Sequence, residues 1–318
     1  MKKLPEEIKG SKILVTGGAG FVGSHIVDRL APQNEVTVLD NLLTGKPENM
    51  AKSRDKIQFI QGDIRDEKLV RDIISGGIDI IFHLAACTSV TGSIENPITD
   101  MDTNVRGTLT VLEACRGAKI KRLVYTSSAA VYGDVKKLPV VEDSPLNPAS
   151  PYATSKMTAE KYCIVYQKIY GVPATAVRCF NIYGPRQSTG VYANAISIFL
   201  RNINNGEPLT IYGDGEQTRD LMYIDDVVNG CMLAATGAGA VGDVFNLATG
   251  KATTVNQLTE LVLKATGKSP AVNHAAPRAG EIRHSLASIA KASRVLGYRP
   301  DTDLEDGIKA TWQAFNEF

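Results

Sequence analysis

The sequence predicts a doubly wound α/β fold, a parallel sheet covered by helices on both faces, followed by a smaller C-terminal α/β domain. Short β-branched runs alternate with amphipathic stretches through the first 180 residues, and a glycine-rich segment directly follows the first run. Continuous apolar runs of this kind are typical of parallel strands that are buried on both faces. After about residue 180 this regularity gives way to shorter pieces separated by Gly and Pro, which indicates a second unit.

Six apolar runs are predicted to be the strands of the large sheet. Each is short and is separated from the next by a stretch with helical period, as expected for βαβ units. The runs cover residues 12–16, 35–40, 57–60, 79–85, 122–127 and 174–180.

The stretches between the runs carry the helical pattern. Between Pro97 and Ala118, apolar residues recur at spacings of three and four, and the segment after Pro151 places Tyr152, Lys156 and Glu160 on one face. The proline-rich residues 134–150 are expected to form a long loop that leads into this second helix. Further helices are predicted over residues 256–267 and 304–315.

The domain assignment follows from these elements. Residues 1–180 are expected to form the first domain, together with a returning segment at about 221–252. Residues 181–220 and 253–318 are expected to form the second domain.

Composition narrows the class of protein. With 43% hydrophobic residues, the 318-residue chain has the composition of an ordinary globular protein. Its net charge of +1 gives no overall positive potential that would attract nucleic acid or an anionic membrane. Its five cysteines include no C-x-x-C pair, so neither a disulfide framework nor a metal site is indicated, and we expect buried, reduced thiols. No apolar run reaches membrane-spanning length, and the N-terminus lacks the apolar core of a signal peptide. The expected location is the cytoplasm.

A dinucleotide site is predicted after the first strand. Gly18, Gly20 and Gly23 have the G-x-G-x-x-G spacing, and Gly17 adds one more position without a side chain. Such a turn lets the backbone approach a pyrophosphate, which rests on the N–H groups of the helix expected to begin near Phe21. The first domain is therefore predicted to be a Rossmann domain.

Asp40 indicates which dinucleotide is bound. It ends the second strand 17 residues after Gly23, where a carboxylate would accept hydrogen bonds from the adenosine ribose. Residues 41–44 contain no Arg or Lys to hold a 2′-phosphate, so NAD is favoured over NADP. Asp63, at the end of the third strand, is a weaker candidate for contact with the adenine.

Catalytic groups are predicted on the fifth strand and on the helix after the long loop. Ser128 and Tyr152 lie 24 residues apart, but both follow the carboxyl ends of parallel strands and can therefore converge. Lys156, one turn after Tyr152, and a cationic nicotinamide would favour the phenolate and make Tyr152 a general base. Taken alone, Y-x-x-x-K is more often surface packing than catalysis.

In combination, these motifs resemble the extended short-chain dehydrogenase/reductase family, in particular its nucleotide-sugar 4-epimerases. The resemblance covers the chain from Lys12 to about Trp312. It is carried by the segments 16–25, 83–90, 104–114, 127–134, 152–156, 180–187, 219–227 and 278–287.

The resemblance implies a role for each matching residue. It makes Tyr152 the general base and acid, Lys156 its electrostatic partner and ribose anchor, and Ser127 and Ser128 the hydroxyls near the sugar O4. Further cofactor contacts are implied at Gly17, Gly20, Phe21, Val22, Gly23, Asp40, Asn41, Thr44, Gly45, Asp63, Ile64, Leu84, Ala85, Ala86 and Thr126. On the substrate side, Asn181, Arg219 and Arg278 would hold the UDP pyrophosphate, and Glu281 the uridine ribose. For each arginine, an ordinary surface charge is the alternative.

The implied reaction is 4-epimerisation of a UDP-hexose through a 4-keto sugar with NAD bound throughout. Ala129 and Ala130 stand where dehydratases of this family carry an Asp-Glu pair and related decarboxylases keep a Glu, so simple epimerisation is preferred. Ser285 falls where a bulky tyrosine restricts epimerases to glucose and galactose, which predicts activity on UDP-GlcNAc and UDP-GalNAc as well.

Three alternatives stay open. One is UDP-glucuronate 4-epimerase, in which Arg186 would pair with the C6 carboxylate, although those enzymes tend to carry Thr at the position of Asn181. The second is another nucleotide-sugar dehydratase or decarboxylase. The third is a sensor that binds NAD or a nucleotide sugar without turnover, which would be expected to lose Tyr152, Lys156 or the serine.

The resemblance also implies a homodimer. Helices at roughly 97–118 and 151–170 form a four-helix interface in this family. The amphipathic pattern itself is equally consistent with packing inside one chain.

Overall fold

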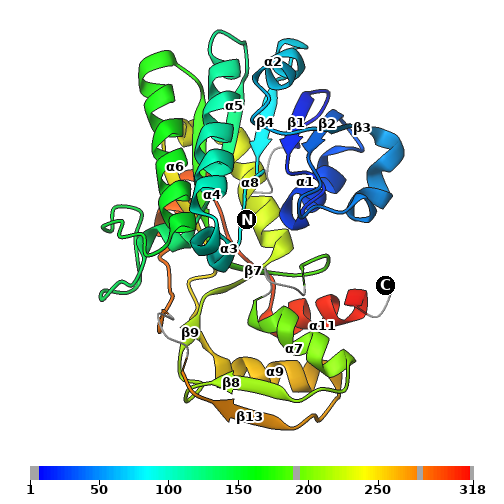
Figure 1. Ribbon diagram of the computed structural model, residues 1–318, viewed down its shortest axis with the longest axis vertical. Coiled ribbons are helices and arrows are strands. Elements are labelled where there is room, and N and C mark those ends of the chain that lie inside the picture. The colour runs from blue at the N-terminus through cyan, green and yellow to red at the C-terminus, as the bar shows by residue number, and fades with distance from the viewer. Residues whose placement is uncertain (1–6, 189–193, 278–281, 316–318) are drawn as a thin grey trace.

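A computed structural model describes residues 7–188, 194–277 and 282–315, and its centre is one parallel sheet (Figure 1). The seven strands follow the order β11-β6-β5-β4-β1-β2-β3. Their bounds are β1 Lys12–Thr16, β2 Glu35–Asp40, β3 Ile57–Gln61, β4 Ile80–His83, β5 Arg122–Ser128, β6 Ala174–Cys179 and β11 Val244–Leu247. The predicted doubly wound fold and its six strands are confirmed, and β11 was missed.

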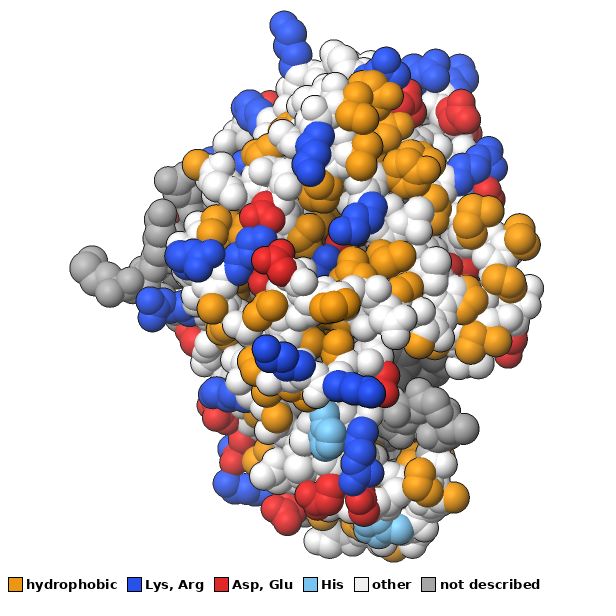
Figure 2. Space-filling model, turned by 90° about the vertical axis from the view of Figure 1, so that its left-hand side faces the viewer, with side chains coloured by type: hydrophobic (Ala, Val, Ile, Leu, Met, Phe, Trp, Pro, Cys, Tyr) orange, Lys and Arg blue, Asp and Glu red, His pale blue; other side chains and the backbone are white. Residues whose placement is uncertain are grey.

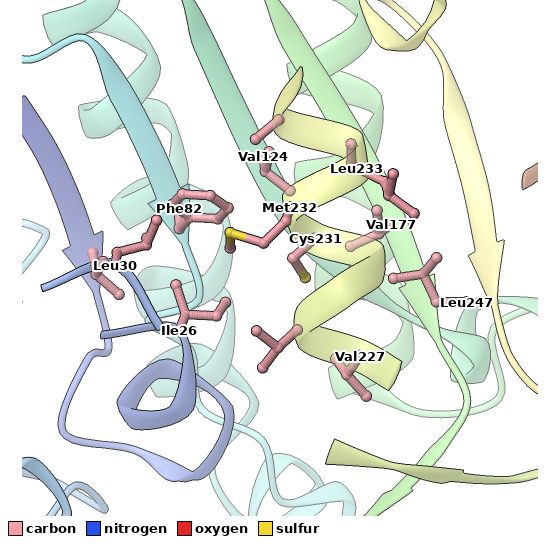
Figure 3. Packing of buried hydrophobic residues seen from close by; sticks show 14 of the residues in the cluster. Ile26, Leu30, Phe82, Val124, Val177, Val227, Cys231, Met232, Leu233 and Leu247 are labelled. Carbon is pink, nitrogen blue, oxygen red and sulfur yellow. The ribbon is translucent and has the colours of Figure 1, made fainter. Parts of the chain in front are cut away.

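Helices cover both faces of this sheet, and alternate residues of one strand enter two different cores. Ile13 and Val15 of β1 pack into the cluster that α1 (Phe21–Leu30) and α8 (Ile224–Thr236) complete (Figure 3). Leu14 packs on the opposite face, against α2 (Glu67–Ser75), α5 (Gly107–Cys115) and α6 (Pro151–Tyr170). This alternation is the reason that the strand sequences read as unbroken apolar runs.

The chain returns to the large sheet after residue 220. Helix α8 lies against β5 and β6, and β11 extends the sheet beside β6 in parallel register. The pattern gave no signal for β11 because its four residues are few and include a polar Asn246.

A smaller unit forms around the helices of the second half. Helices α7 (Ala195–Asn204), α9 (Val255–Thr266) and α11 (Leu304–Phe315) enclose a third core with β8 (Leu209–Tyr212). The other elements are short. They comprise β7 Asn181–Tyr183 paired with β10 Leu221–Tyr223, β9 Thr218–Arg219 paired with β12 Thr253–Thr254, β13 Val272–Ala275 paired with β8, α10 Ala290–Leu296, and the 3₁₀ turns η1 Pro47–Lys56, η3 Ala129–Tyr132 and η4 Ala238–Ala240.

The helix predicted between Pro97 and Ala118 is interrupted. It follows α3 (Val90–Glu95) and divides into α4 (Pro97–Met101), a π-helical turn at Asp102–Arg106 and α5. A π turn adds one residue to the repeat and shifts the phase of the apolar face. Ile98 is consequently 73% exposed, whereas Leu112 is fully buried.

Four of the five cysteines are buried, and Cys87 is half-buried. In the described ranges, no helix is both long and apolar enough to cross a bilayer.

Candidate active site

A cavity of about 900 Å³ lies at the carboxyl ends of the sheet strands. Of the predicted cofactor residues, all except Gly45 and Asp63 line it. Ser128 lines it too, whereas Asn181, Arg219 and Ser285 are not part of its wall. Arg278 and Glu281 lie outside the described residues.

The glycine turn between β1 and α1 is too tight for side chains. A Cβ on Gly23 would lie 2.1 Å from the carbonyl oxygen of Gly17, and Gly17 itself has a φ of +72°. Helix α1 begins after Gly20 with no side chain capping its first N–H groups. An uncapped helix N-terminus behind a close backbone turn is suited to bind a pyrophosphate.

Asp40 is fixed at the end of β2. Its Oδ2 accepts a hydrogen bond from the Ala19 N–H at 2.9 Å and its Oδ1 one from the Leu42 N–H at 2.8 Å. Burial raises the pKa of this carboxyl, and the two hydrogen bonds oppose that shift. Lys46, just beyond the window of 41–44 considered in the sequence, also lines the cavity. The predicted preference for NAD therefore rests on Asp40 and not on an absence of nearby cations.

Asp63 does not line the cavity and is hydrogen-bonded to Arg65 and Asn41 instead. Arg65 donates to its Oδ1 at 2.9 Å and to its Oδ2 at 2.8 Å, and Asn41 also donates to Oδ2. The hydrogen bonds from Arg65 lower the pKa of this carboxyl to about 2. The structure thus gives Asp63 the role of orienting Arg65 and Asn41, and only Asn41 of these reaches the cavity wall.

Tyr152, Lys156 and Ser128 converge as predicted. Tyr152 follows Pro151 in the first turn of α6, which Ser150 caps, and the Ser128 hydroxyl lies beside its phenol. Burial raises the pKa of this phenol, and the nearby Ser128 hydroxyl opposes that shift. The predicted lowering of the Tyr152 pKa is therefore not produced by the protein groups around it.

Lys156 is buried beneath Tyr152. Its side chain is 3% exposed, and its ammonium lies 4.5 Å from the centre of the Tyr125 ring. Burial lowers the pKa of Lys156 to about 8. A buried ammonium at the cavity wall is available to hold a ribose hydroxyl, because the cation–π contact uses no hydrogen bond.

Ser127 points away from Tyr152. Successive residues of a strand face opposite sides, and the Ser127 hydroxyl donates to Glu160 Oε2 at 2.7 Å behind the cavity wall. Of the two serines predicted near the sugar O4, only Ser128 has its hydroxyl beside Tyr152.

Three of the predicted substrate residues, Asn181, Arg219 and Ser285, lie at one segment outside the cavity wall. Asn181 donates to the carbonyl of Asp220 at 3.0 Å, and the Ser285 N–H donates to the carbonyl of Thr218 at 3.1 Å. Arg219 lies between these two carbonyls. Asn181 and Ser285, which lie far apart in the chain, are thus both brought to residues 218–220.

Arg186 lines the cavity, but its charge is already paired. Its Nη2 donates to Asp28 Oδ2 of α1 at 2.6 Å. Its Nη1 is buried and has no hydrogen-bond partner, so one donor of this guanidinium stays available at the cavity wall.

Several wall residues were missed in the sequence. They come from helices that arrive late in the chain, Leu200 and Asn204 of α7 and Thr311 and Phe315 of α11, or from the stretch Lys46–Asn49. No local motif marks them, because their place at the cavity depends on how distant segments pack.

The residues fit a dinucleotide. The Thr126 hydroxyl oxygen is buried at the cavity wall and has no hydrogen-bond partner. Buried polar atoms in proteins are nearly always hydrogen-bonded, so this oxygen indicates a ligand partner. Together with the glycine turn, Asp40 and Lys156, it provides contacts along the whole length of such a cofactor. The fold and the site define an enzyme of the dinucleotide-binding class with a Tyr–Lys–Ser centre.

Comparison with known proteins shows the family. Residues 13–248 match the model of the NAD dependent epimerase/dehydratase family, and the chain belongs to that family. A UDP-glucose 4-epimerase of Mycolicibacterium smegmatis is 39% identical over 308 residues, 96% of this chain and 98% of the relative. A dTDP-glucose 4,6-dehydratase of Actinoplanes is 36% identical over 313 residues, 94% and 96% of the two chains.

Solved structures agree over nearly the full length. UDP-N-acetylglucosamine 4-epimerase from Methanobrevibacter ruminantium, solved in complex with UDP-N-acetylmuramic acid, has a TM-score of 0.92 at 37% identity, with 98% of this chain and 99% of that chain covered. The Thermus thermophilus UDP-glucose 4-epimerase, solved with NAD, has a TM-score of 0.87 at 38% identity, with 96% and 99% covered.

Replacing Thr126 by valine tests the cofactor contact. Thr126→Val keeps the shape but removes the hydroxyl, so we expect NAD⁺ affinity to fall about 2- to 12-fold, the value of one hydrogen bond of about 0.5–1.5 kcal/mol. Titration of the cofactor-free protein with NAD⁺ measures this. Thermal stability without NAD⁺ should not fall, because the hydroxyl has no protein partner to lose. Unchanged affinity would contradict the assignment.

Proposed function

We propose that the protein catalyses reversible 4-epimerisation of UDP-hexoses with bound NAD. The substrates are UDP-GlcNAc and UDP-GalNAc together with UDP-Glc and UDP-Gal. The observation that carries this proposal is the convergence of Tyr152, Ser128 and Lys156 at a cavity whose described wall has no carboxylate next to them. Among the described residues, the only carboxylates of the cavity wall are Asp40, at the end of β2, and Glu48, in η1.

The chemistry at C4 needs only a proton shuttle from the protein. NAD, when bound, supplies the hydride acceptor and donor. Tyr152 takes the proton of the sugar 4-hydroxyl and returns it after the 4-keto sugar has turned. Ser128, whose hydroxyl lies beside Tyr152, orients the same sugar hydroxyl, and the positive charge of Lys156 one helical turn away favours the phenolate.

Dehydration is disfavoured by the residues after Ser128. Elimination across C5 and C6 requires an additional acid and base beside the sugar. Ala129 and Ala130 begin the turn η3 at that place and carry no ionisable group. UDP-glucuronate epimerisation is the second candidate, because Arg186 Nη1 has no partner at the cavity wall, although its Nη2 is paired with Asp28. A sensor without turnover has no need of the convergent Tyr–Lys–Ser group.

Replacing Tyr152 tests the reaction. Purified protein is incubated separately with UDP-GlcNAc, UDP-Glc and UDP-GlcA plus catalytic NAD⁺, and products are identified by NMR. The galacto-configured product of the first two is expected. Tyr152→Phe should lower kcat at least about 100-fold, the lower end of general acid–base contributions, while NAD⁺ still binds.

Tyr170→Phe, at an exposed position of the same helix, is the matched control and should keep full activity. A keto-deoxy or pentose product, or galacturonate alone, would overturn the assignment.

Replacing Ser285 tests the choice of sugar. Ser285→Tyr should remove the space for a 2-acetamido group and suppress turnover of UDP-GlcNAc at least about 10-fold, an effect of the size expected for a steric pocket change. UDP-Glc turnover should change little and serves as the internal control. Equal loss on both sugars would contradict a role of Ser285 in selecting the substrate.

We further propose that the protein is a homodimer through α3, α4 and α6. These helices pack together and expose apolar side chains on their outer surface, an arrangement that marks an interface when the patch is large. The residues are Val90, Ile94, Ile98, Met101, Tyr162, Val165 and Ile169. In Figure 2, hydrophobic side chains gather on the upper part of the face on which α6 lies in Figure 1.

Charging this surface should dissociate the dimer. Ile98→Asp and Ile169→Asp place carboxylates on side chains that are 73% and 66% exposed, so the monomer should remain folded. Analytical ultracentrifugation should give the dimer mass for the unmodified protein and the monomer mass for the double variant. Val241→Asp, a change at an apolar side chain outside this surface, should leave the mass unchanged. A monomeric unmodified protein would contradict the proposal.

A further inference from the structure

Glu160 is a fully buried carboxylate one helical turn beyond Lys156 on α6. Its side chain is 0% exposed, and it forms an ion pair with Arg178 of β6, whose side chain is 2% exposed. Arg178 donates from Nη2 to Oε1 at 2.6 Å and from Nε to Oε2 at 2.9 Å. The hydroxyl of Ser127 on β5 donates to Oε2 as well. One carboxylate therefore connects α6 with two neighbouring strands.

The register of the sheet relates this ion pair to the active site. Ser127 lies opposite Arg178, and Ser128 lies opposite Cys179. Ser127, Ser128 and Cys179 all line the cavity, but the Ser127 hydroxyl and the Arg178 guanidinium are directed to Glu160, as expected from the alternation of side chains along a strand. Ser127 is the direct chain neighbour of Ser128, whose hydroxyl lies beside Tyr152. A shift of β5 relative to α6 would therefore change the Ser128–Tyr152 contact directly.

Arg178 extends the network to β11, the edge strand of the sheet. Its Nη1 donates to the Tyr132 hydroxyl at 2.8 Å and to the carbonyl of Glu142 at 2.9 Å. Tyr132 in turn donates to Asn246 Oδ1 of β11 at 2.6 Å. Every charged atom of the pair thus has a partner. Buried ion pairs of this kind seldom add stability over an apolar pair of the same shape, so stability alone is a poor account of this one.

We propose that Glu160 is a positioning residue, which holds Ser128 opposite Tyr152 by fixing β5 through Ser127 and β6 through Arg178. The inference rests on the proposed epimerisation. Glu160 touches neither substrate nor cofactor, since it is fully buried and is not part of the cavity wall.

The charge of Glu160 also acts on the catalytic lysine. Burial is the largest influence on the pKa of Lys156 and lowers it, whereas Glu160 raises it. The other titratable or charged groups around Lys156 and Tyr152 lie on β4, α4, β5, α6 and β6. They are His83, Asp100, Tyr125, Cys163 and Cys179. Removing the Glu160 charge while Arg178 stays leaves one uncompensated positive charge beside this group.

Three variants separate position from charge. Ser127→Ala removes the link to β5 and leaves the ion pair intact. Glu160→Gln removes the charge, and Glu160→Gln with Arg178→Gln restores neutrality. Thr158→Val, at an exposed hydroxyl of α6 that bonds only within its helix, is the matched control. Each holoenzyme is assayed with UDP-Glc across pH, and NAD⁺ affinity is measured in parallel.

The expected result is a loss in kcat without a loss in binding. Ser127→Ala should lower kcat about 3- to 10-fold, the effect of one hydrogen bond made in the transition state, with KM and NAD⁺ affinity unchanged. Glu160→Gln should also move the acidic limb of the kcat profile down by about one pH unit, because the added positive charge favours the phenolate. The neutral double variant should return the limb to its original pH but keep the lower kcat.

Other outcomes would overturn the proposal. Unchanged kcat in Ser127→Ala, or a rise in KM alone, would show that Ser127 does not hold Ser128 in place. If Glu160→Gln does not fold, Ser127→Ala and the neutral double variant still test whether Glu160 positions Ser128. If the unmodified protein turns over no UDP-sugar, the proposed function fails. The positioning role is then judged from the pH titration of Tyr152, read as the ultraviolet difference from Tyr152→Phe, which Glu160→Gln should move to lower pH.

Discussion

The in-register parallel pairing of β1 with β2 and β4 is the constraint on which the site depends. Thr16, the last residue of β1, lies opposite Leu39 on one side and His83 on the other. All strands of the large sheet point the same way, so every residue that follows a strand arrives at one edge. The glycine turn, Asp40 and Ser128 come from three strands and reach one cavity for this reason.

Buried polar contacts fix that edge where apolar packing cannot. His83 hydrogen-bonds Thr16 at 2.7 Å and Thr108 at 3.0 Å, and burial lowers its pKa to about 3, so the ring is neutral. Thr108 donates its only hydroxyl proton to Asn104, so His83 Nε2 must be the donor to Thr108 and Nδ1 the acceptor from Thr16. This direction of hydrogen bonds ties β1 and β4 to α5 without any charge. Glu160 and Arg178, by contrast, connect β5 and β6 to α6 through a pair of opposite charges.

The sequence predicted what short-range patterns determine. Six strands, the glycine turn, Asp40 and the Tyr152–Lys156 pair each depend on residues within a few positions, and the structure brings them together as expected. The orientation of Ser127 was not predictable, because adjacent serines look alike until a buried acceptor such as Glu160 is known. The exposure of Ile98 was not predictable either, because the π turn that shifts the helical phase leaves no signal in the sequence. Wall residues from α11 depend on packing across nearly the whole chain.

The loop after β7 links parts of the chain that otherwise have separate cores. Arg186 is bound to Asp28 of α1, and its neighbour Gln187 accepts a hydrogen bond from Ser197 of α7 at 2.6 Å. His25 of α1 is hydrogen-bonded to the carbonyl of Pro185 at 3.1 Å. Two successive residues thus bind elements on opposite sides of the cavity. Movement of α1 away from α7 would therefore stretch the Arg186–Asp28 ion pair or the Gln187–Ser197 hydrogen bond.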